Sequence, residues 1–85
     1  MKQFAYVIKD PIGLHARPAG LLVKEARTYK SRITVSTSEK SAEATKLMAL
    51  MAMCVKNGMT VTVSAEGEDE SECIAGLKKF FEENL

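Results

Sequence analysis

The spacing of apolar residues alternates between two periods along the chain, and this alternation constrains the fold more than any other feature. Residues 59–65 alternate strictly between apolar and polar side chains, which is typical of a strand with one buried face. Residues 16–29 instead place apolar side chains three and four positions apart, as in an amphipathic helix. The predicted order is strand 3–9, helix 16–29, strand 32–37, short strand 41–44, helix 46–56, strand 59–65 and a helix that follows Asp69.

This βαββαβα order predicts an α+β fold, a two-layer open-faced sandwich. We expect an antiparallel four-stranded sheet with three helices on one face and a polar, solvated opposite face. At 85 residues the chain is expected to be one domain, residues 1–85, since domains rarely fall far below this size. Such a domain holds one modest core and no deep substrate cavity.

Polar residues are expected to mark the ends of the later helices. Thr45 is a candidate cap for helix 46–56, and Asn57 with Gly58 is expected to end that helix, because both tolerate a left-handed backbone. Asp69 and Glu72 have the spacing of a capping box at the start of the last helix. The acidic residues there also suit the positive end of the helix dipole.

Composition argues against several classes of protein. A net charge of +1 is unlike the basic excess of nucleic-acid binders. The longest apolar run, residues 47–55, is far shorter than the roughly 20 residues of a membrane span, and the start of the chain does not resemble a secretory signal. Cys54 and Cys73 are isolated and the chain has one histidine, so we expect no metal site and a reducing, cytoplasmic location.

One segment combines residue types that suit phosphate chemistry, Gly13 to Pro18. Gly13 permits a tight turn, His15 falls at the expected N-cap of the first helix, and Pro18 lies in its first turn. The free amide groups of that turn and the helix dipole bind anions, phosphate in particular. Arg17 is close enough to pair with the same phosphate oxygens.

A neutral imidazole at an anion-binding helix end can act as a nucleophile. Its ring nitrogen can attack phosphorus and hold the group as a phosphoramidate, while backbone amides and Arg17 spread the charge. The residues alone leave two other interpretations open. His15 could simply cap the helix, and Arg17 could be an ordinary solvated charge.

Residues 13–18, Gly-Leu-His-Ala-Arg-Pro, resemble the active-site signature of the histidine-containing phosphocarrier (HPr) family of the bacterial sugar phosphotransferase system. Chain length, element order and the segment 64–70 resemble that family too, so the likeness covers essentially the whole chain. It implies that enzyme I, charged by phosphoenolpyruvate, phosphorylates Nδ1 of His15 and that enzyme IIA domains take the group. Arg17 would assist transfer, and the amides of Ala16 and Arg17 would hold the phosphate. The protein would be a monomeric, stoichiometric carrier without a cofactor.

Helix 46–56 is apolar around nearly its whole circumference, so one 85-residue core cannot cover it completely. It is either a Met-rich core helix or an exposed, adaptable docking surface. The resemblance implies the docking surface, with a basic rim that attracts acidic partners. The implied contacts are Gly20, Leu47, Met48 and Met51, with Arg17, Lys24 and Arg27 as the rim.

Three positions depart from the family pattern. Lys46 occupies the position of the regulatory serine of many relatives; Thr45 and Ser41 lie near it but do not match, so no regulatory serine is predicted. Ile12 replaces a small polar residue that could order the turn before His15, and Cys54 replaces a frequent glycine.

Two other functions remain open from the sequence. The chain could be a nitrogen-branch or regulatory paralogue with the same histidine chemistry. It could also be a small α+β nucleic-acid-binding domain, a class that stacks bases on aromatic side chains exposed on the sheet. The positions of the aromatic residues fit a core better than an exposed strand face, so no nucleic-acid partner is predicted.

Overall fold

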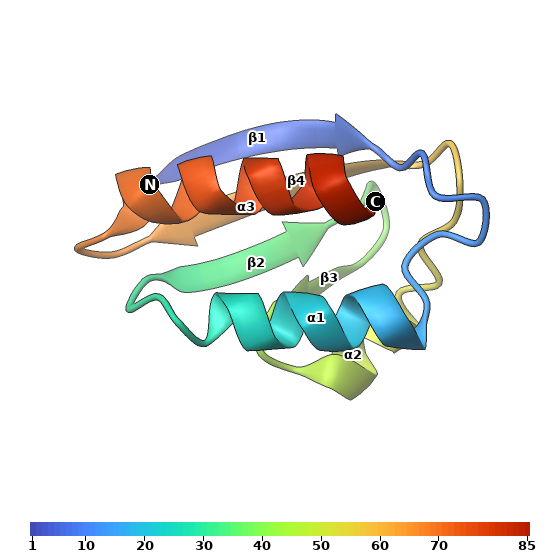
Figure 1. Cartoon of the computed structure of the whole chain (residues 1–85), viewed down its shortest axis with the longest axis horizontal. Coiled ribbons are helices and arrows are strands. Elements are labelled where there is room, and N and C mark those ends of the chain that lie inside the picture. The colour runs from blue at the N-terminus through green and yellow to red at the C-terminus, as the bar shows by residue number, and fades with distance from the viewer.

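The computed structural model describes all residues of the chain, 1–85, and shows four strands and three helices in the predicted order. Figure 1 shows α1 and α3 lying across one sheet, with the N-terminal end of α1 beside the loop that follows β1. The elements are β1 (Lys2–Val7), α1 (Ala16–Ala26), β2 (Arg32–Ser36), β3 (Ser41–Glu43), α2 (Leu47–Ala52), β4 (Thr60–Glu66) and α3 (Glu70–Asn84).

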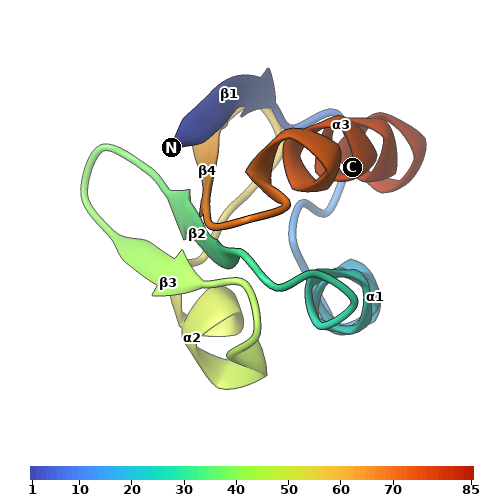
Figure 2. The ribbon, with the colours of Figure 1, turned by 90° about the vertical axis from the view of Figure 1, so that its left-hand side faces the viewer.

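All strand pairs in the sheet are antiparallel, and the strand order is β1-β4-β2-β3. Val63 of β4 lies opposite Phe4 of β1 on one side and Val35 of β2 on the other. Figure 2 views the sheet along its strands and shows the helices on one side of it. The predicted open-faced sandwich is therefore confirmed.

The core lies between the sheet and the helices because strand residues of one parity face inward. Val61, Val63 and Ala65 of β4 are at most 1% exposed, whereas the residues between them face the open side. Phe81 of α3 meets the rings of Phe4 and Tyr6 edge-on, with centroids 5.8 and 5.6 Å away. These strand aromatics are on the covered face, so the open face offers no aromatic platform for stacking bases.

Helix α2 is shorter than expected, and both of its predicted boundaries are wrong. Lys46, not Thr45, is the N-cap, and no side chain caps the helix. The helix ends because Cys54 adopts a left-handed backbone with φ +54°, four residues before Gly58. The same conformation explains why glycine suits this position, since glycine adopts it without a steric penalty. Gly58, with φ +86°, shapes the next turn and donates to the Ile8 carbonyl.

The first helix, α1, ends at Ala26, before the predicted boundary near residue 29. None of the three helices combines the length and the hydrophobicity that crossing a membrane requires.

The start of α3 also differs from the expected capping box. Asp69 is the N-cap residue, but its carboxylate makes no cap and accepts hydrogen bonds from the Lys30 amide, the Ser31 amide and the Ser31 hydroxyl. These bonds, the Ser31 hydroxyl foremost, lower the pKa of Asp69 below its ordinary 3.8. Asp69 therefore ties the α1–β2 loop to α3 instead of closing its own helix.

Candidate functional site

His15 occupies the N-cap of α1, as predicted, with an extended backbone (φ −96°, ψ −175°). Its carbonyl accepts the Ala19 amide at 2.9 Å, which starts the helix. Its imidazole makes no capping hydrogen bond and so remains available for chemistry. Ala16 and Arg17 are the first two helical residues, and their amides have no acceptor within the helix, while Pro18 has no amide hydrogen. Two free donors therefore lie directly after the imidazole.

The turn before His15 is fixed by main-chain contacts. Gly13 has φ +92°, and a Cβ there would collide with the carbonyl oxygen of Val55 and come within 2.6 Å of the Cα of Lys56. The Leu14 amide donates to the same Val55 carbonyl at 2.9 Å. Only glycine fits this close approach, and it pins the His15 loop against the segment that follows α2.

Asp10 orders the turn in place of a polar residue at position 12. Its Oδ1 accepts the amides of Ile12 at 2.8 Å and Gly13 at 3.1 Å, which is the Asx-turn arrangement. The Ile12 side chain is 66% exposed and takes no part in it. The departure at Ile12 therefore leaves the turn ordered through its backbone amide.

Asp10 is also the acidic neighbour of His15, which the sequence reasoning missed. Its Oδ1 lies 3.8 Å from Nε2 of the imidazole, and the two side chains are 25% and 35% exposed. An aspartate directly before Pro-x-Gly is a known turn signal, and that signal could have identified the residue.

A hollow of about 230 Å³ opens beside the imidazole. Arg17 supplies its positive charge and forms no ion pair within the protein, whereas Asp10 and Glu83 supply carboxylates. The end of α3 lies close because the Leu85 carbonyl accepts the Lys9 and Asp10 amides. The lining residues are Asp10, His15, Arg17, Pro18, Leu21, Glu83 and Asn84. The hollow is shallow and open to solvent.

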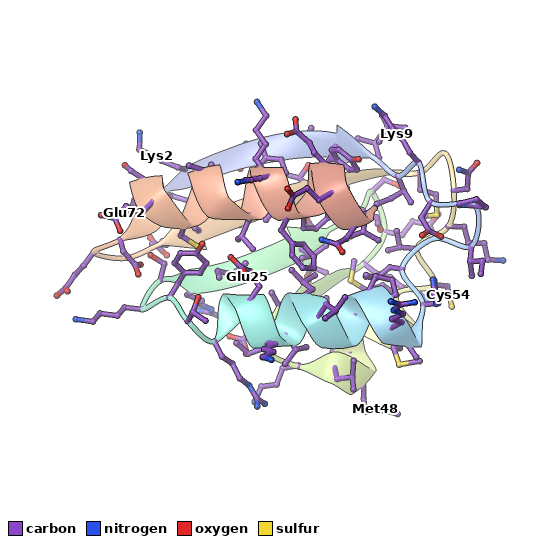
Figure 3. The ribbon with its side chains drawn as sticks, in the orientation of Figure 1. Lys2, Lys9, Glu25, Met48, Cys54 and Glu72 are labelled. Carbon is purple, nitrogen blue, oxygen red and sulfur yellow. The ribbon has the colours of Figure 1, made fainter.

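Helix α2 exposes most of its apolar side chains. Leu50 is its one buried residue, while Met48 is 78% exposed and Leu47 and Met51 are also exposed. Figure 3 shows Met48 projecting from α2 away from the sheet. The structure therefore excludes the interpretation of α2 as a wholly buried core helix.

The other residues expected for docking lie on α1 or beside it. Lys24 and Arg27 are exposed, and Gly20 is half-buried with open space where a side chain would stand. Lys46 is exposed at the start of α2. Leu21 is exposed as well. The sequence did not single it out as a surface residue, because it lies next to the apolar stripe of the helix but is not part of it.

Comparisons with known proteins agree with this geometry. Residues 2–83 match the family model described as the PTS HPr component phosphorylation site. The chain is 40% identical to the phosphocarrier protein HPr of Mycoplasma capricolum over 79 residues, covering 93% of this chain and 89% of that one. It is 45% identical over 65 residues to HPr of Haemophilus influenzae, covering 76% of each chain.

Solved structures show the same fold over nearly the whole chain. The crystal structure of HPr-C-His from Thermoanaerobacter tengcongensis superposes with a TM-score of 0.93 at 40% identity, covering 99% of this chain and 94% of that chain. Crh of Bacillus subtilis, described as a swapped dimer, superposes with a TM-score of 0.78 at 35% identity, covering 100% and 98%. The match in sequence and fold shows that the chain belongs to the HPr family of phosphocarriers of the phosphotransferase system.

Proposed function

We propose that His15 accepts a phosphoryl group from enzyme I and passes it to sugar-specific enzyme IIA domains. The observation that carries this proposal is an uncapped imidazole at the N-terminus of α1, directly before the free amides of Ala16 and Arg17. His15 is the only histidine of the chain, so a phosphohistidine carrier has no other acceptor.

The transfer requires no proton to leave the ring. The lone pair of Nδ1 attacks phosphorus while the bond from phosphorus to the donor group on enzyme I breaks, and its electron pair leaves with the donor. The phosphoryl oxygens then lie against the amides of Ala16 and Arg17 and the Arg17 guanidinium, which neutralise their charge. On delivery, a nucleophile of the enzyme IIA domain attacks phosphorus, the bond to Nδ1 breaks and the ring regains its lone pair. The protein thus carries one phosphoryl group per cycle.

In this proposal the docking surface combines exposed apolar side chains of α2 with Gly20 of α1. We define it by Gly20, Leu47, Met48 and Met51, with Arg17, Lys24 and Arg27 as its basic rim. Flexible methionine side chains suit a surface that must fit two unlike partners, enzyme I and enzyme IIA domains. We propose that the chain performs this role as one domain, residues 1–85, as a cytoplasmic monomer, and without serine regulation at Lys46.

The test is incubation with phosphoenolpyruvate and enzyme I, followed by phosphorus NMR. We expect one acid-labile phosphoramidate signal on Nδ1 of His15 and none in the His15→Ala variant. Amide spectra establish that the variant is folded. A signal that persists in His15→Ala, or a wild-type protein that stays unlabelled with active enzyme I, contradicts the proposal.

A further inference from the structure

We propose that Asp10 is a positioning residue for His15: its carboxylate selects the ring tautomer that leaves Nδ1 free and stabilises the positive charge of the phosphorylated ring. This inference rests on the proposed function of His15 and adds to it the residue that prepares the nucleophile. It is carried by the 3.8 Å separation of Asp10 Oδ1 and His15 Nε2.

The position of Asp10 is fixed by bonds that do not involve His15. Its Oδ1 accepts two amides of its own turn, from Ile12 and Gly13. Its own amide donates to the Leu85 carbonyl at 2.8 Å. The carboxylate is therefore held in place whether or not the imidazole is phosphorylated, which is what preorganisation of a charged group requires.

A carboxylate beside Nε2 determines which nitrogen carries the proton of the neutral ring. The Nε2–H form directs its hydrogen toward the negative charge, whereas the other tautomer would direct a lone pair at it. Nδ1 is bonded to Cγ and is therefore the ring nitrogen nearer the main chain. With the proton held on Nε2, Nδ1 keeps its lone pair free for attack on phosphorus.

The same charge acts after transfer. When a neutral ring that keeps its Nε2 proton forms a bond from Nδ1 to phosphorus, the ring gains a positive charge. Asp10 faces that charge, as a carboxylate behind a histidine does in other catalytic sites. Because the ring and the carboxylate are only partly buried, solvent screens the attraction and its effect on rate is modest.

The other charged groups at the hollow do not share this geometry. Arg17, on α1, carries the opposite charge, and Glu83, on α3, lines the hollow without an ion pair to His15. Glu83→Gln therefore serves as the matched control, since it removes a carboxylate from the same hollow without touching the Asp10 turn.

The test compares wild type with Asp10→Asn and Glu83→Gln. Asparagine keeps an Oδ1 that accepts the Ile12 and Gly13 amides, so the turn is preserved while the charge is lost. Nitrogen-15 NMR of the unphosphorylated ring shows which nitrogen carries the proton. We expect the Nε2–H population to fall in Asp10→Asn and the transfer rate from enzyme I to drop about fivefold, the upper range for a partly exposed pair. Glu83→Gln should change neither.

An unchanged tautomer population and rate in Asp10→Asn overturn the inference, as does an equal change in Glu83→Gln. If amide spectra show a disturbed turn in Asp10→Asn, Asp10→Ser repeats the test, because its hydroxyl also accepts turn amides. The tautomer is measured without any phosphoryl donor. Failure of the proposed function, seen as an unlabelled wild type, is therefore distinguishable from failure of this inference.

Discussion

Each end of the molecule contains an aspartate and a glycine that lies against another main-chain segment, yet the two aspartates have different partners. At the far end, Asp69 accepts hydrogen bonds from Lys30 and Ser31, which are 39 and 38 residues away in sequence. At the site end, the Asp10 carboxylate accepts only amides of its own turn. The Asp69 carboxylate therefore holds the start of α3 against the α1–β2 loop. The Asp10 carboxylate bonds no distant segment, and its Oδ1 lies 3.8 Å from Nε2 of the imidazole.

The glycines repeat this contrast. Gly67, with φ +156°, lies against Ser31, and a Cβ there would come within 2.7 Å of the Ser31 Cα. Gly13 lies against the backbone of Val55 and Lys56. Both positions require a close approach of main chains, but only the one at Gly13 lies in the loop just before His15, the proposed nucleophile.

Alanine at the two glycines gives the largest expected effect. Gly13→Ala and Gly67→Ala should each lower the free energy of unfolding by about 1–4 kcal/mol, because the backbone must move to admit a Cβ. Only Gly13→Ala should also slow phosphoryl transfer per folded molecule, since it displaces the His15 loop. Urea unfolding and enzyme I assays measure both quantities. Equal losses of transfer in the two variants would break the comparison.

Asp69→Asn gives the next effect, and it depends on pH. The pKa of Asp69 in the folded protein is below its ordinary 3.8, so its ionised form contributes stability that is fully present above that value and lost as the pH falls below it. The urea midpoint of wild type should therefore exceed that of Asp69→Asn at neutral pH, and the gap should close in acid. Transfer per folded molecule should not change. A gap that widens in acid would contradict this role.

Met48→Glu should have the smallest effect on stability, within about 0.5 kcal/mol, because the side chain is 78% exposed. Its effect on binding should be larger, with about tenfold weaker association with enzyme I, since a charge would enter the apolar docking surface. Titration calorimetry measures the affinity. Val7→Glu, a charge placed at an exposed apolar residue outside the docking surface, is the matched control and should bind normally. Equal weakening in both variants would remove the docking role of α2.

The sequence predicted the features that depend on neighbours in the chain. The N-cap position of His15, the turn at Gly13 and the place of Pro18 follow from local backbone rules, and the structure confirms them. The sequence could not predict the partners of Asp69, because the donors on Lys30 and Ser31 come close to it only after folding. An aspartate at position 69 could form either a capping box or a tertiary contact, and the local sequence does not distinguish the two.

The end of α2 shows the same limit. Asn57 and Gly58 are the better left-handed formers, yet Cys54 adopts that conformation because Met53 and Val55 on either side are drawn into the core. Burial of these two side chains therefore outweighed the preference of glycine and asparagine for a left-handed backbone. The roles of His15 and the docking surface stay predictions that the experiments above decide, and the role of Arg17 also stays a prediction.

The strand order makes the loop that carries His15 depend on residues that come much later in the chain. Within the sheet, β1 pairs only with β4. The loop that carries His15 is held by a main-chain hydrogen bond to Val55, and Ile8 before it bonds to Gly58 and Met59. During synthesis on the ribosome, His15 is therefore made well before the residues that hold its loop in place. We expect a chain that stops before Val55 to lack the main-chain contacts that order the His15 loop.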